Sequence, residues 1–172
     1  MRIALICDDY LPDSTRVSAK MMHELACEIL KKGHDPIVFC PNGGAEKKLT
    51  VLDLDGVIVY RYPNGPTKDV SKIRRALNES LLSFNAWRFL SEVIRNNKID
   101  GVIYYSPSIF FGQFVKKITD YWCCKSYLIL RDSFPQWLVD QGIIRSRGIL
   151  EKYFRFFENK NYKAASYIGV MS

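Results

Sequence analysis

The chain alternates between short apolar runs and longer segments whose apolar residues recur every three or four positions. The short runs predict buried strands, and the longer segments predict amphipathic helices. Strands are expected over residues 2–7, 36–40, 49–53, 57–62, 100–105, 126–130 and 166–171, and helices over 13–32, 70–96, 106–122, 135–141 and 150–165. Strands that alternate with helices are typical of an α/β fold with a mostly parallel sheet and right-handed crossovers.

Turn and capping residues set the expected boundaries. Asp13 and Ser14 are residue types that cap helix N-termini, and Gly33 is a typical helix stop. Leu54-Asp55-Gly56 between two strands predicts a hairpin or a bulged strand. No repeat, low-complexity linker or internal domain boundary is evident, so the sequence predicts a single domain over residues 1–172.

The composition is that of an ordinary globular chain. Of 172 residues, 48% are hydrophobic and 25% are charged, and no stretch approaches the roughly 20 apolar residues of a membrane-spanning helix. Five cysteines are irregularly spaced without a C-x-x-C pair, which favours a reducing cytoplasm over a disulfide scaffold. Only two histidines occur, His23 and His34, so a metal site is not expected.

The net charge is strongly positive. Lys and Arg number 25 against 18 Asp and Glu, giving +7. Such a surface favours the binding of negatively charged partners: nucleic acids, anionic lipid head groups or phosphorylated substrates. A basic but inert surface is the alternative.

Candidate binding residues follow the predicted strands. Parallel strands end at one edge of a sheet, and ligands bind there. Asp132, Arg131, Ser106 and Ser108 occupy such positions, together with the loop that runs from Asp8 to Arg16. Helix capping or turn formation is the alternative role for each polar side chain.

The loop after the first strand, residues 8–16, contains no glycine. A dinucleotide or P-loop site needs glycines there so that the backbone can approach phosphates. Their absence counts strongly against NAD, FAD and P-loop nucleotides, and no cofactor is expected. The following helix still offers free N–H groups and a positive dipole end. Thr15 and Arg16 at that end could hold a phosphate or a sugar hydroxyl, or Arg16 could simply be exposed.

Four segments resemble a known family. RIALICDDYLPDSTRVSAKMMHELACEILKKGH resembles the opening of the bacterial family-four glycosyltransferases, which have the GT-B fold. DGVIYYSPSIFFG and SYLILRDSFPQWLVDQGII resemble the subgroup that builds lipopolysaccharide and colanic acid. YKAASYIGVMS resembles the last helix and strand of the family's N-terminal domain. The resemblance covers nearly the whole chain, and residues 131–137 are its most specific part.

The resemblance implies a Rossmann-like N-terminal lobe with helices on both faces of the sheet. In such two-lobed enzymes this lobe shapes the acceptor site, and a second domain, absent from this chain, binds the nucleotide-sugar. Transfer occurs with retention at the anomeric carbon and usually without a metal. The chain is therefore expected to be part of a glycosyltransferase and inactive alone.

The resemblance also assigns expected roles. Where many members have a Gly pair, this sequence has Asp13, Ser14, Thr15 and Arg16, so side chains or other N–H groups would contact a phosphate. Where many members have a His, it has Arg131 and Asp132, and Asp132 is the expected catalytic residue that orients an acceptor hydroxyl or accepts its proton. Arg131 could neutralise a pyrophosphate, or the two could only pair and fix their loop. The expected substrate-binding residues are Asp13, Ser14, Thr15, Arg16, Ser106, Ser108 and Arg131.

The subgroup's acceptor implies a membrane surface. A sugar on polyprenyl pyrophosphate lies at the inner leaflet, so a peripheral location on the cytoplasmic face is expected. Phe110, Phe111, Lys116 and Lys117 are the predicted membrane contacts. In the alternative, the aromatics belong to the core, as expected for Phe114, and the lysines form a solvated face.

Two other functions stay open. The chain could be a non-catalytic subunit that recruits a separate donor-binding chain of a split glycosyltransferase to the membrane. A nucleic-acid-binding module is indicated only by the positive charge, and no nucleic-acid partner is expected.

Overall fold

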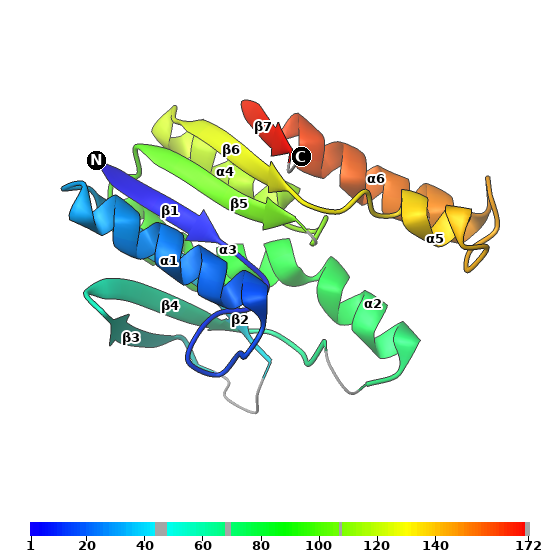
Figure 1. Ribbon diagram of the computed structural model, residues 1–172, viewed down its shortest axis with the longest axis horizontal. Coiled ribbons are helices and arrows are strands. Elements are labelled where there is room, and N and C mark those ends of the chain that lie inside the picture. Colours follow the sequence, from blue (N-terminus) through cyan, green and yellow to red (C-terminus); the bar gives the residue numbers. More distant parts are fainter. Residues whose placement is uncertain (44–47, 68–69, 107, 171–172) are drawn as a thin grey trace.

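Seven strands form one sheet in the computed structural model, which describes residues 1–43, 48–67, 70–106 and 108–170 (Figure 1). Their order across the sheet is β3-β4-β2-β1-β5-β6-β7. Among these strands of the described residues, only β3, at one edge, runs antiparallel to its neighbour β4, and all other neighbours are parallel. The strands are β1 Arg2–Ile6, β2 Asp35–Asn42, β3 Thr50–Leu54, β4 Val57–Pro63, β5 Gly101–Ser106, β6 Lys125–Leu130 and β7 Tyr167–Val170. The predicted α/β fold with a mostly parallel sheet is confirmed.

Helices cover both faces of the sheet. One face packs against α1, Val17–Lys31, through a core that includes Leu5, Val38 and Met22. The other face carries α3, α4 and α6, whose core includes Phe39, Leu90 and Phe114. The remaining helices are α2 Lys72–Ser80, α3 Leu82–Asn96, α4 Gly112–Trp122, α5 Gln136–Asp140 and α6 Ile149–Lys163.

Several helix boundaries differ from the prediction. The first helix begins at Val17 rather than at Asp13, because the predicted caps have other partners: Asp13 pairs with Arg61, and Ser14 Oγ donates to Asp9 Oδ2 at 2.6 Å. The helix predicted over 70–96 is two helices, α2 and α3, which meet at Leu81. The helix predicted over 106–122 begins only at Gly112, and Pro107 in its predicted opening lies outside the described residues, as does Met171 at the end of the last strand.

Burial contradicts the prediction that Phe110 and Phe111 contact a membrane. Their exposed fractions are 4% and 0%, and the Phe110 ring centroid lies 4.8 Å from that of Phe157 on α6. Both rings fill the core because α4 and α6 come together here: a Cβ at Gly112 would lie 2.5 Å from the Lys160 carbonyl oxygen. These aromatics form core, as expected for Phe114.

The two predicted basic contacts do lie on the surface. Lys116 and Lys117 are exposed on α4. Lys116 Nζ donates to Asp120 at 2.9 Å, and Lys117 Nζ lies 5.0 Å from the Trp87 ring centroid. Within the described residues, no helix is long and apolar enough to cross a bilayer.

Candidate functional site

The strand order reverses at β1, which places a crevice at the carboxyl ends of the central strands. From β1 the chain continues to β2 on one side, whereas β5 pairs with β1 on the other. In open α/β sheets such a switch point is where ligands bind. In Figure 1 the arrowheads of β1, β5 and β6 point toward the side on which α2 and α5 lie. Two cavities, of about 400 and 200 Å³, lie at this edge.

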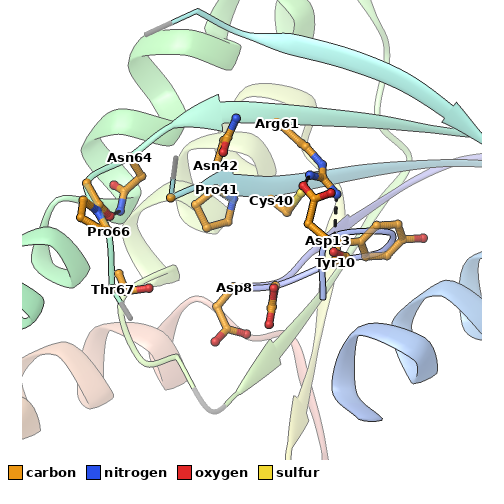
Figure 2. Close-up of a pocket in the computed structure, with 13 residues that line it drawn as sticks. Asp8, Tyr10, Asp13, Cys40, Pro41, Asn42, Arg61, Asn64, Pro66 and Thr67 are labelled. Atoms are coloured by element: carbon orange, nitrogen blue, oxygen red, sulfur yellow. Dashed lines mark hydrogen bonds and ion pairs between the residues drawn. The ribbon is translucent and has the colours of Figure 1, made fainter. Parts of the chain in front are cut away.

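The larger cavity, here called the Arg61 cavity, lies between the loop after β1 and the ends of β2 and β4 (Figure 2). Its polar lining includes Asp8, Asp13, Asn42, Arg61 and Asn64. Such a cavity offers both hydrogen-bond donors and acceptors, which suits a hydroxyl-rich or phosphorylated ligand.

Arg61 fixes the wall of this cavity. Its side chain is buried on β4, pairs with Asp13, and donates through Nη2 to the Leu11 carbonyl oxygen at 2.7 Å. Its Nε atom is buried without a hydrogen-bond partner in the described part of the chain. Arg61 therefore holds the loop after β1 against β4, and Asp13 reaches the cavity while bound to it (Figure 2).

The smaller cavity, here called the Asp132 cleft, combines charged and aromatic walls. Its polar residues are Asp8, Arg16, Thr67, Arg75, Glu79, Ser108 and Asp132, and its apolar wall is formed by Pro41, Leu82, Phe110, Phe134 and Trp137. Arg75 Nε donates to Glu79 at 2.8 Å, and Arg16 Nε lies 3.6 Å from Asp9. A few polar groups beside exposed aromatic faces are typical of small-ligand sites.

Asp8 lines both cavities and has an unusual protonation equilibrium. Burial raises the pKa of the Asp8 carboxyl above its usual range, and the nearby Asp9 and Glu79 carboxylates raise it further, whereas Arg16 lowers it. A carboxyl with a raised pKa can hold or release a proton closer to neutral pH than an ordinary aspartate.

We expect Asp8→Asn to stabilise the protein relative to wild type as the pH rises. Since the folded-state pKa of Asp8 is raised, the folded protein binds more protons than the unfolded chain, and stability falls as pH rises from the unfolded pKa of about 3.9 through the folded value. Asparagine removes this loss. Urea unfolding at about pH 4 and about pH 7 measures how the difference in stability between the variant and wild type changes with pH. Asp140→Asn, at an exposed position, is the control. A variant-to-wild-type difference that does not change with pH would contradict the prediction.

The structure brings some predicted site residues together and not others. Arg16, Ser108 and Asp132 line the Asp132 cleft, and Asp13 lines the Arg61 cavity. Neither cavity is lined by Ser14, Thr15, Ser106 or Arg131 in the described part of the chain. Ser14 and Ser106 are buried, with 3% and 1% of their surface exposed, and Thr15 is exposed outside both cavities. Arg131 Nη1 donates to the Tyr105 hydroxyl at 3.2 Å, which directs its guanidinium toward β5.

Among the lining residues that sequence reasoning missed are Arg61, Arg75, Glu79 and Trp137. Arg61 carried a signal, because a charged residue interrupts the apolar run of β4. Arg75 and Glu79 are four apart on α2, a spacing that only places them on one helix face. Trp137 belongs to the most specific segment of the resemblance, yet nothing in the sequence pointed its ring toward the cleft.

Metal-binding side chains gather elsewhere. Among the described residues, the group of histidine, cysteine and acidic side chains close enough to hold an ion is His23, Cys27 and Asp55, beside α1. As far as the structure describes their lining, the strand-end cavities hold carboxylates but no histidine.

Comparison with known proteins shows the fold. No protein-family model matches the sequence, and no curated protein matches it. Among solved structures, the chain is similar to the catalytic domain of starch synthase IV from Arabidopsis thaliana bound to ADP and acarbose, with a TM-score of 0.54 and 12% sequence identity. The match covers 76% of this chain and 34% of that chain, so the chain spans about a third of its length.

At this identity the likeness establishes architecture only. The chain has an α/β fold whose mostly parallel sheet and flanking helices resemble one lobe of the GT-B fold. The predicted fold is therefore confirmed. The likeness does not distinguish family four from other families with this fold.

Proposed function

We propose that this chain is the acceptor-side, N-terminal lobe of a retaining glycosyltransferase. The full enzyme would move a sugar from a nucleotide-sugar to a saccharide linked to polyprenyl pyrophosphate in cell-surface polysaccharide synthesis. The observation that carries the proposal is the Asp132 cleft, which gathers Asp8, Ser108 and Asp132 at the switch point of a GT-B-like lobe. The likeness to a catalytic domain bound to ADP and acarbose supports this chemistry.

The cleft offers each group that a sugar acceptor needs. The Trp137 ring, 41% exposed, gives a flat apolar face for a sugar ring. Asp132 and Ser108 can hydrogen-bond to sugar hydroxyls, and Asp132 can accept the proton of the attacking hydroxyl. Arg16 and Arg75 supply positive charge for a phosphate or pyrophosphate.

The donor would bind through a second domain outside this chain. The loop between β1 and α1, residues 7–16, contains no glycine that would let the backbone approach a nucleotide phosphate closely. The cavities of this lobe would therefore position the acceptor, while the second domain positions the nucleotide-sugar. The chain alone would lack transferase activity.

A transferase assay tests the proposal. The full-length gene product would be incubated with a panel of UDP- and GDP-sugars and a polyprenyl-pyrophosphate saccharide, and nucleotide release and product mass would be followed. We expect transfer from a particular donor, and none by residues 1–172 alone. Full activity of residues 1–172 alone, or no transfer by the full-length product with any donor, would contradict the proposal.

We expect Lys116→Glu with Lys117→Glu to weaken binding to vesicles that contain anionic lipids. Each lysine near such a surface contributes about 1 kcal/mol, so reversing both should lower partitioning about tenfold or more at physiological salt. The control is Lys31→Glu with Lys32→Glu, which makes the same change in net charge at the exposed end of α1. An equal loss of vesicle binding in both double variants would show that binding depends on the net charge of the chain and not on the position of Lys116 and Lys117.

A further inference from the structure

Three potential metal ligands converge where α1 meets the β3–β4 hairpin. His23 and Cys27 lie one helical turn apart on α1, and Asp55 is in the hairpin turn. His23 Nε2 lies 2.9 Å from Asp55 Oδ2 and 3.6 Å from Cys27 Sγ, and the three ligand atoms all lie within 4.8 Å of one another. They come from segments 32 residues apart, so the tertiary fold creates this cluster.

These separations suit a tetrahedral ion. With metal–ligand bonds of about 2.0 Å to nitrogen and oxygen and about 2.3 Å to sulfur, neighbouring ligands in a tetrahedron lie about 3.3 to 3.6 Å apart. The nitrogen–sulfur separation already has this value, and the nitrogen–oxygen separation needs to widen by a few tenths of an ångström. The Asp55 side chain is 74% exposed, which leaves it free to make that shift and gives an ion access from solvent.

The backbone of the hairpin presents Asp55 to the helix. Asp55 and Gly56 have φ values of 53° and 80°, as in the two-residue turns that favour Asp-Gly. Gly56 N donates to Asp53 Oδ1 at 2.8 Å, which closes the turn. The backbone of the turn is therefore fixed so that the carboxylate of Asp55 faces His23.

A neighbouring hydroxyl orients the imidazole. The Tyr10 hydroxyl lies 2.9 Å from His23 Nδ1, and the two rings pack edge to face with centroids 5.6 Å apart. Histidine ligands of metals usually have such a partner on the second ring nitrogen, which fixes the ring and the tautomer. Tyr10 also lines the Arg61 cavity, so this contact joins the cluster to the candidate site.

We propose that His23, Cys27 and Asp55 form a Zn²⁺ site. An imidazole, a thiolate and a carboxylate are ligands that zinc prefers, and a water molecule completes the fourth position. The ion takes the place of the proton between His23 Nε2 and Asp55. The imidazole proton then resides on Nδ1 and points to the Tyr10 oxygen, and the Cys27 thiol releases its proton to solvent.

The site would hold the β3–β4 hairpin against α1 and stabilise the loop that carries Tyr10. Zinc binding is therefore expected to stabilise the folded chain, since an ion that binds only the folded state shifts the unfolding equilibrium. This role is independent of sugar transfer.

The experiment uses the full chain after metal removal by a chelator. Zn²⁺ is titrated against a chromophoric competitor, Co²⁺ is used as a spectroscopic probe, and the melting temperature is measured with and without Zn²⁺. We expect one equivalent to bind, a thiolate-to-cobalt absorption band, and a higher melting temperature with zinc. Cys27→Ser should lose the band, and Asp55→Asn should weaken affinity by at least the roughly tenfold that losing an outer-shell partner of a ligand costs.

Two matched controls make the test specific. Cys123→Ser removes an exposed thiol elsewhere, and His34→Gln removes the other histidine, so both should bind zinc like wild type. Absence of saturable one-to-one binding would overturn the proposal, as would a cobalt band that survives Cys27→Ser. His23→Gln is a further variant. Because His23 is buried, this variant could fail to fold, and Cys27→Ser, at a partly buried position, and Asp55→Asn, at an exposed one, then decide the result.

Discussion

Asp132→Asn is expected to lower the turnover of the full-length transferase by about 10²-fold to 10⁴-fold, the contribution of a positioned general base. Asp132 is exposed on the loop after β6 and lines the cleft beside Ser108 and Trp137. Because its side chain is exposed, the free energy of unfolding should change by less than about 0.5 kcal/mol. Steady-state kinetics and urea unfolding measure the two effects on the same preparation.

Asp140→Asn is the matched control for this prediction. Asp140 is an exposed aspartate on α5, where it accepts a hydrogen bond from Gln136 at 2.7 Å and lines neither cavity. Its substitution should leave turnover unchanged. If Asp132→Asn keeps wild-type turnover, Asp132 has no acid–base role, and a raised KM alone would assign it to acceptor binding.

Arg61→Met is expected to lower the free energy of unfolding by about 2 to 3 kcal/mol. The methionine fills much of the volume but cannot donate to the Leu11 carbonyl oxygen or pair with Asp13. Charged hydrogen bonds of this kind each contribute about 1.5 to 3 kcal/mol. The loss stays below that of a fully buried ion pair because Asp13 is 71% exposed and regains water. The urea midpoint at an unchanged m-value reports the difference.

Two further variants locate the origin of this loss. Asp13→Asn keeps Arg61 and its bond to Leu11, so it should cost less than about 1 kcal/mol. Arg131→Met removes an exposed arginine from the same edge and should be nearly neutral. An unfolding midpoint that is the same for Arg61→Met and Arg131→Met would show that the loop after β1 does not depend on Arg61.

The fold was largely predictable because buried parallel strands leave a strong hydrophobic signal. Each of the seven strands was expected within a few residues, and the Asp55-Gly56 turn marked the hairpin. Helix starts were harder to predict. Asp13 and Ser14 have the chemistry of caps, yet their partners, Arg61 and Asp9, come from outside the expected helix. Capping propensity reflects competition between local hydrogen bonds of the side chain and those of the backbone. It carries no information about partners from other parts of the fold.

The candidate site was only partly predictable. Strand ends located Asp132, Ser108 and Arg16, because topology alone brings those positions to one edge. The direction of a side chain was not predictable from its position at a strand end. Arg131 was expected to face a ligand, but its guanidinium contacts the Tyr105 hydroxyl. The pattern of aromatics and lysines in 109–117 was interpreted as a surface, although an apolar run next to lysines equally describes one helix with a buried and an exposed face.

The placement of Asp8 in the common wall of both cavities makes them energetically dependent on each other. An anion seated in one would favour the neutral form of the shared carboxyl, and the neutral form would in turn accept a second anion more readily in the other. By reciprocity, each occupant changes the affinity for the other by the same factor. A ligand with two negatively charged parts, one in each chamber, would thus favour the protonated form of Asp8 from both sides.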